Sequence, residues 1–111
     1  MIIHQDLTHG RWFEIPLIEQ LSNVGCDLDR AVRWRDKGDL ETSRKAFNRA
    51  LELFNFTIND PKNSPCQDEL VRVNNALIDY FLGNNENDLT DEEWYDYFMF
   101  YNYMYAIQKG K

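Results

Sequence analysis

A run of carboxylates opens the last helical segment of this 111-residue chain, and these side chains could hold a metal ion. Asp91, Glu92 and Glu93 are consecutive, and Asp96 falls on the same helical face as Glu93. Carboxylate oxygens bind Mg²⁺, so the cluster suggests metal-dependent hydrolysis of a nucleotide or small molecule. An octahedral ion needs ligands from a facing helix, and no Glu-x-x-Glu occurs elsewhere. We therefore predict that the carboxylates chiefly complement the helix dipole, with the hydrolase kept as an alternative.

A second cluster is basic and lies between residues 30 and 49. Its members would suit an RNA-associated or antitoxin-like protein: Arg30, Arg33, Lys37, Arg44 and Lys45. Residues 1–58 carry eight Lys and Arg against nine Asp and Glu, whereas residues 59–111 carry four against ten. The whole chain has a net charge of −7, which repels phosphate at long range. Nucleic-acid binding is therefore a further alternative and not the favoured function.

Aromatic side chains fill the segment that follows the carboxylates. Eight of the twelve residues from Trp94 to Tyr105 are aromatic, and in a helix they would occupy every face. One set has the spacing of a stripe that packs into the core: Trp94, Tyr97, Phe98, Tyr101 and Tyr105. The remaining large side chains are predicted to form an interface with another protein, most simply a second copy of the chain: Tyr95, Met99, Phe100 and Tyr103.

Four amphipathic segments must position these clusters. Apolar residues recur at three- and four-residue spacing, which predicts helices over about 16–37, 40–58, 65–82 and 91–108. Gly38 and Asp39 predict a two-residue link, because glycine ends a helix in the left-handed conformation and aspartate caps the next one. Capping boxes are predicted at Ser64–Gln67 and Thr90–Glu93.

These segments predict an all-α fold, an up-down-up-down four-helix bundle over residues 1–111 as one domain. Residues 1–14 lack helical periodicity but include Trp12 and Phe13, so we predict an N-terminal extended strap along the bundle. No apolar run is long enough for a membrane span, and the N-terminus lacks the pattern of a signal peptide. A cytoplasmic location is therefore expected.

Motifs for catalysis and cofactor binding are missing from the sequence. The two cysteines, Cys26 and Cys66, are forty residues apart and do not have metal-ligand spacing. Both histidines precede the first predicted helix, so no imidazole is placed to activate a nucleophile in the bundle. We expect no resident cofactor or metal and predict no catalytic residue.

Several segments together resemble a family of short, all-helical bacterial proteins with no established activity. They are Gln5–Phe13, Leu17–Gly25, Arg49–Leu53, Asp60-Pro61, and Asp79-Tyr80-Phe81 before a Gly-Asn loop. The resemblance covers most of the chain and implies a four-helix fold without implying site residues. The connection after Asp-Pro is basic in that family, whereas Pro61–Cys66 is nearly neutral here. The favoured function is thus a non-enzymatic interaction protein, a homo-oligomer with a possible further protein partner.

Overall fold

The computed structural model describes residues 12–110, which form α-helices and one 3-10 helix and contain no strand. The elements are α1 (Trp12–Glu14), α2 (Leu17–Asp36), α3 (Leu40–Asn59), η2 (Pro61–Cys66), α4 (Gln67–Leu82) and α5 (Asp91–Lys109). The four long helices begin and end within two residues of the predicted bounds. Most of the predicted strap, residues 1–11, lies outside the described residues.

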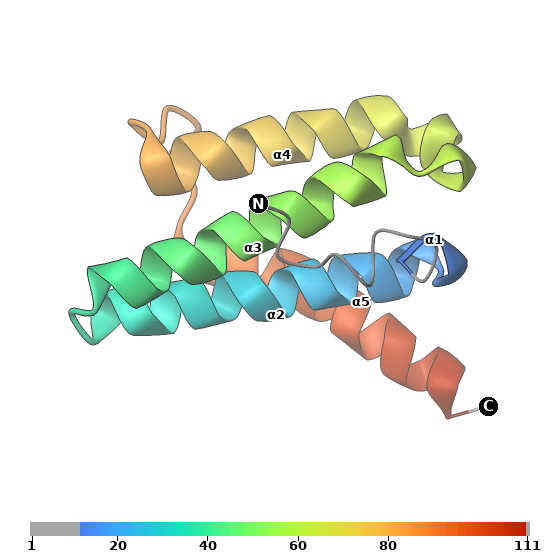
Figure 1. Cartoon of the computed structure of the whole chain (residues 1–111), viewed down its shortest axis with the longest axis horizontal. Helices are drawn as coiled ribbons and strands as arrows, with labels where there is room; N and C mark the ends of the chain where they lie inside the picture. The colour runs from blue at the N-terminus through green and yellow to red at the C-terminus, as the bar shows by residue number, and fades with distance from the viewer. Residues whose placement is uncertain (1–11, 111) are drawn as a thin grey trace.

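The long helices form the predicted up-down-up-down bundle (Figure 1). Helices α2 and α3 lie antiparallel at the centre; α4 packs on α3, and α5 packs on the other side of α2. The axis of α5 is inclined to that of α2, so its C-terminal end diverges from the other helices (Figure 1). The last turns of α5 are consequently the least covered part of a long helix in this bundle.

The core is apolar and is supplied mainly by α2 and α3, as their amphipathic patterns predict. Its buried side chains are Trp12, Leu21, Val24, Leu28, Ala31, Ala46, Phe47, Ala50, Leu53, Phe54, Ile58, Leu70, Leu77, Trp94 and Phe98. Aromatic contacts connect α3 with its neighbours. Phe47 stacks on Phe81 of α4 with a distance of 4.1 Å between ring centroids, and Phe54 meets Phe98 of α5 edge to face with 6.5 Å between centroids. Aromatic pairs of this kind stabilise a core beyond the area that they bury.

In the link between α2 and α3, Gly38 and Asp39 have the predicted roles in ending one helix and capping the next. Gly38 adopts φ +89°, a conformation that a side chain would strain, and Asp39 accepts a hydrogen bond from the Thr42 backbone N–H at 3.0 Å. This bond and one from the Thr42 hydroxyl hold the pKa of Asp39 below its ordinary value. The tight link fixes the antiparallel hairpin.

The connection between α3 and α4 differs from the prediction. Ser64 does not cap a helix there, because Pro61–Cys66 forms η2, whose N-cap is Asp60. The Asp60 carboxylate accepts a hydrogen bond from the Lys62 backbone N–H at 3.2 Å, and α4 begins only at Gln67. Asp60 followed by Pro61 is a helix-cap residue before a proline, and Ser64 followed by Pro65 repeats this pattern four residues later. The first of the two signals determines the local structure.

The end of the predicted strap is not extended: Trp12–Glu14 forms the short helix α1, which packs against α2 and α3. Trp12 is buried and donates a hydrogen bond from its indole nitrogen to the Thr57 hydroxyl at 3.2 Å, whereas Phe13 is partly exposed. Tyr95, Met99, Phe100 and Tyr103 of α5 are exposed although Trp12 and Phe13 are both in place. The part of the strap that the structure describes therefore does not account for the surplus of aromatic residues in α5.

Candidate interaction surface

The side of α5 that faces away from the bundle carries a row of large apolar side chains that are exposed. Its residues, called the outer face below, are Tyr95, Met99, Phe100, Tyr103 and Ile107. Tyr103 is 65% exposed and Phe100 58% exposed, values typical of polar residues on a solvated helix. Four of the five recur every fourth residue, so they form one ridge along the helix. Each residue of the interface predicted from sequence is exposed, and Ile107 extends the same ridge.

Packing on the opposite side of α5 fixes the rotation of the helix about its own axis. Trp94 and Phe98 are buried, and Tyr97 and Tyr101 pack against the core beside them. A Cβ atom added at Gly25 of α2 would lie 2.5 Å from the Phe98 Cβ, closer than two carbon atoms can approach. The two helices thus touch at this point, and rotating α5 about its axis would move Phe98 away from the space that the missing side chain of Gly25 leaves.

A polar clasp fixes the start of α5. Arg35 of α2 and Tyr80 of α4 both donate hydrogen bonds to the Asp91 carboxylate. Partial burial alone would raise the pKa of Asp91, but these two bonds outweigh it and hold the pKa below its ordinary value. Burial and the bond to Asp91 raise the pKa of Tyr80 to about 12. The predicted N-cap is present too, since Thr90 accepts a hydrogen bond from the Glu93 N–H at 3.1 Å.

A groove with a volume of about 450 Å³ runs between α2 and α5 along one edge of the outer face. The α2 side is formed by Gly25, Cys26, Leu28, Asp29, Val32 and Arg33. The α5 side includes Tyr95 and Met99, which belong to the outer face as well. The exposed apolar surface therefore continues over the edge of α5 into a shallow recess.

The carboxylates of the predicted metal cluster are in structural contacts or on the surface. Asp91 is held in the clasp, the Glu93 carboxylate lies 3.3 Å from the Thr90 hydroxyl, and Glu92 and Asp96 are exposed. Among residues 12–110, no three His, Cys, Asp or Glu side chains are grouped closely enough to hold a metal ion. These contacts give no support to hydrolase chemistry at the start of α5.

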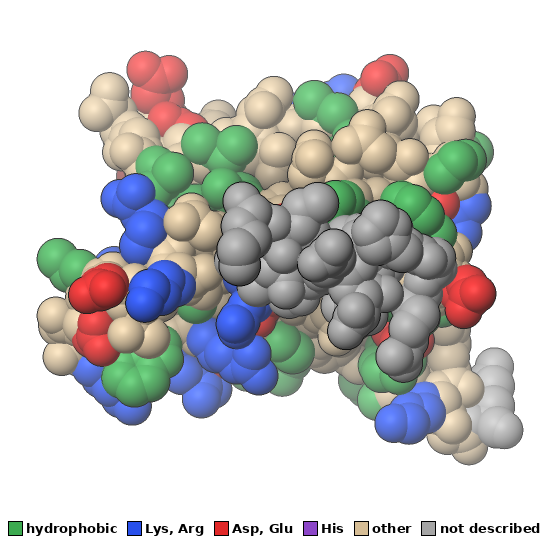
Figure 2. Space-filling view, in the orientation of Figure 1, with side chains coloured by type: hydrophobic (Ala, Val, Ile, Leu, Met, Phe, Trp, Pro, Cys, Tyr) green, Lys and Arg blue, Asp and Glu red, His purple; other side chains and the backbone are tan. Residues whose placement is uncertain are grey.

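The predicted basic cluster forms a surface of α2 and α3 near the link that joins them. Figure 2 shows Lys and Arg side chains gathered over these two helices. Three of the five predicted residues pair with carboxylates one helical turn away, with N–O distances of 2.9–3.6 Å: Arg30 with Asp27, Arg33 with Asp29, and Lys45 with Glu41. Lys37 lies 5.0 Å from the ring of Trp34, and Arg44 is exposed. Local pairing leaves less positive charge for phosphate than the sequence suggests.

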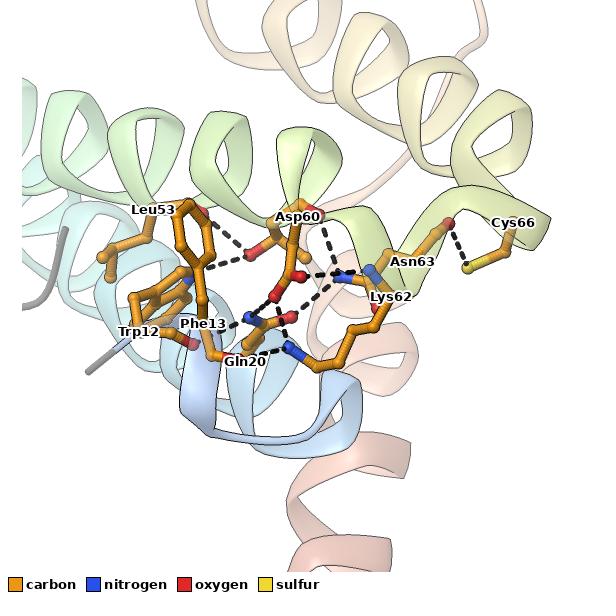
Figure 3. A network of polar contacts seen from close by, with 9 residues as sticks. Trp12, Phe13, Gln20, Leu53, Asp60, Lys62, Asn63 and Cys66 are labelled. Carbon is orange, nitrogen blue, oxygen red and sulfur yellow. Dashed lines mark hydrogen bonds and ion pairs between the residues drawn. The ribbon is translucent and has the colours of Figure 1, made fainter. Parts of the chain in front are cut away.

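The most highly connected polar residues were not predicted as a group. Figure 3 shows them where α1, α2, α3 and η2 meet. The Gln20 amide donates to the Asp60 carboxylate at 2.9 Å and to the Trp12 carbonyl at 3.0 Å, and it accepts from the Asn63 amide at 2.9 Å. Lys62 pairs with Asp60 and also donates to the Phe13 carbonyl at 3.1 Å. We call these residues the Gln20 network.

The Gln20 network is suited to holding the fold together and not to reacting with a ligand. Gln20, Asp60 and Asn63 are buried, and each has hydrogen-bond partners within the chain. Burial would raise the pKa of Asp60, but bonds from Lys62 and Gln20 lower it below its ordinary value. A signal was present in the sequence, because Gln20 interrupts the apolar stripe between Leu17 and Leu21. A polar residue at such a position needs a buried partner.

The fold and surface together define an all-α bundle whose last helix is apolar on both sides. Among the helices of residues 12–110, none has the length and apolar character needed to cross a lipid bilayer. No protein-family model, curated protein or solved structure matches the chain. The resemblance to short helical bacterial proteins stays a prediction, and the outer face is the feature from which a function can be inferred.

Proposed function

We propose that this protein is a non-enzymatic interaction protein that self-associates through the outer face of α5. One observation carries the proposal: five large apolar side chains are exposed on one side of a helix whose other side is already packed. Contiguous apolar surface of this kind marks sites of association in soluble proteins. Aromatic residues are also enriched in interface cores and among the residues that dominate binding energy.

The size of the outer face suits a second copy of the chain. An aromatic side chain can bury about 150–250 Å², so the exposed fractions of these five residues offer roughly 500 Å² per copy. A two-fold pair would bury roughly 1,000 Å² of apolar surface before its polar rim is counted, near the lower limit of about 1,200 Å² for stable interfaces. We therefore expect a dissociation constant in the micromolar range.

Light scattering after gel filtration, from low to high micromolar concentration, tests the proposal. The wild type should change from one chain to two as the concentration rises. Phe100→Ala and Tyr103→Ala should each weaken the dimer about tenfold or more, because buried anchors of this type contribute about 1–4 kcal/mol. Val71→Ala is the matched control, since Val71 is an exposed apolar residue of α4, outside the outer face.

A wild-type mass of one chain at every concentration would contradict self-association. The outer face would then be covered by residues 1–11 or by a different protein. Equal weakening by Val71→Ala would show that association is nonspecific and that α5 has no special part in it.

A further inference from the structure

The geometry points to an antiparallel, two-fold pairing of α5 with α5 of a second copy, with Met99 of each chain opposite Tyr103 of the other. This inference rests on the proposed self-association and specifies how the two copies meet. It follows from the distribution of charge along the outer face and from the direction in which α5 leaves the bundle.

Charge along α5 is strongly asymmetric. Glu92 and Asp96 are exposed and, at 100° per residue, fall within the sector of the helix that carries the outer face. Lys109, the basic residue of the last turn, falls outside this sector, and its ammonium lies 5.9 Å from the centroid of the Tyr105 ring. A parallel pair would bring the Glu92 and Asp96 carboxylates of both copies together at one end of the interface, where like charges repel. An antiparallel pair instead places the carboxylates of the two copies at opposite ends of the interface.

The helix dipoles favour the same arrangement. The acidic first turn of α5 lies at its positive end, and the C-terminal turn carries the opposite partial charge. Two antiparallel copies put the positive end of one helix beside the negative end of the other. Dipoles and side-chain charges thus act in the same direction.

The register comes from the symmetry of the ridge. Tyr95, Met99, Tyr103 and Ile107 are evenly spaced, so their midpoint lies between Met99 and Tyr103. A two-fold axis at that midpoint places Tyr95 opposite the partner's Ile107 and Met99 opposite the partner's Tyr103. All four apolar positions are then covered in both copies, whereas a shift by one turn would leave an apolar residue of each chain uncovered.

Steric access is open for this pairing. The outer face is directed almost opposite to Trp94 and Phe98, so the two bundles would lie on the far sides of the paired helices. In Figure 1 the C-terminal half of α5 runs away from α2, and residues 106–109 are exposed. Each projecting end could then extend along the acidic half of the partner's α5.

Cysteine cross-linking distinguishes the two orientations. Cys26 and Cys66, the natural thiols, are first replaced by serine in all proteins. Tyr95→Cys and Ile107→Cys are then prepared separately, one of them with a tag that changes its mass, and are oxidised alone and as a mixture. Positions 95 and 107 are about 18 Å apart along a helix, whereas a disulfide requires Cα atoms within about 7 Å.

The expected result is a disulfide between Cys-substituted positions 95 and 107 in the mixture, and little cross-linking of either protein alone. A mixture of Met99→Cys and Tyr103→Cys should behave in the same way. Circular dichroism checks that each variant remains helical, which the exposure of all four positions favours.

Preferential cross-linking of each variant with itself would establish a parallel pair and overturn the inference. Failure of all combinations to cross-link, in samples that light scattering shows to be dimeric, would overturn it too, and the proposed self-association would survive. Monomeric samples would instead contradict the proposed function, so the two failures are distinguishable.

Discussion

The Gln20 network and the outer face of α5 are opposite in how their side chains match their surroundings. In the network, polar groups lie inside the protein and are hydrogen-bonded to one another. On the outer face, apolar groups lie in water without a matching surface in the residues that the structure describes. The polar residues that look most like a site therefore hold α1, α2, α3 and η2 together, and the apolar residues are the ones available to a partner.

This difference separates stability from function in the chain. Removing a member of the network should destabilise the fold and leave the properties of the surface intact once the protein is folded. Truncating a residue of the outer face should weaken association and leave the stability of the fold nearly unchanged. The following substitutions test that separation in order of expected effect on stability.

Gln20→Ala should have the largest effect. The substitution leaves the Asp60 carboxylate, the Asn63 amide and the Trp12 carbonyl each without one hydrogen bond in a buried place, at about 1–3 kcal/mol for an unsatisfied group. We expect the free energy of unfolding to fall by about 3 kcal/mol in urea denaturation. Gln108→Ala on exposed α5 surface is the matched control and should change it by less than about 0.5 kcal/mol. A small loss for Gln20→Ala would mean that water replaces the amide.

Gly25→Ala should have the next largest effect and acts on the packing that directs the outer face outward. The new Cβ would overlap Phe98 and push α5 from α2, at about 1–3 kcal/mol, partly offset by the higher helix propensity of alanine. A net loss of about 1–2 kcal/mol in thermal or urea unfolding is expected. Gly110→Ala, where the nearest atom would be 3.4 Å away, is the control. Unchanged stability at Gly25 would show that the two helices are not in close contact.

Thr90→Ala tests the N-cap of the helix that carries the outer face. The hydroxyl accepts a hydrogen bond from the Glu93 N–H, and losing a cap of this type costs about 1 kcal/mol. Thr90→Ser keeps the hydroxyl and should retain most of the stability. If alanine and serine behave alike in urea denaturation, the cap does not contribute to holding α5.

Acid should weaken the clasp at the start of α5. Because the folded state lowers the pKa of Asp91, the clasp stabilises the fold above about pH 4 and loses this contribution as the pH falls below the unfolded-state value. The pair is partly exposed, so the effect should be below about 1 kcal/mol. Asp91→Asn should reduce the fall in stability between pH 5 and pH 3. An identical pH profile in the variant would assign the acid sensitivity to other groups, among them Asp60.

Helix positions and caps could be predicted because they depend on residues close in sequence. Gly38, Asp39 and Thr90 have the predicted local roles. The inward stripe is confirmed at Trp94, Tyr97, Phe98 and Tyr101, whereas Tyr105, beyond the point where α5 diverges, is not among the residues packed against the core. The error at Ser64 arose where two cap-then-proline patterns lie four residues apart and compete. Sequence periodicity cannot decide between them, because the buried contacts of Asp60 with Lys62 and Gln20 favour the earlier one.

The candidate surface was predictable in part. Aromatic residues on every face of one helix required some of them to be exposed, and Tyr95, Met99, Phe100 and Tyr103 are. The Gln20 network and the Arg35–Asp91–Tyr80 clasp were not predicted, because several of their hydrogen bonds join residues that are 40 or more positions apart in the sequence. Contacts of this range depend on how helices pack, and a single sequence does not specify that packing.

Nuclear magnetic resonance of the wild-type protein during dilution tests the central claim most directly, since it reports both whether the chains associate and where. We predict that chemical shifts change with concentration at Tyr95, Met99, Phe100, Tyr103 and Ile107 and remain constant at Gln20, Asp60 and Asn63. The changes should follow a single micromolar dissociation constant. Spectra that do not depend on concentration, or shifts that change away from α5, would contradict the account.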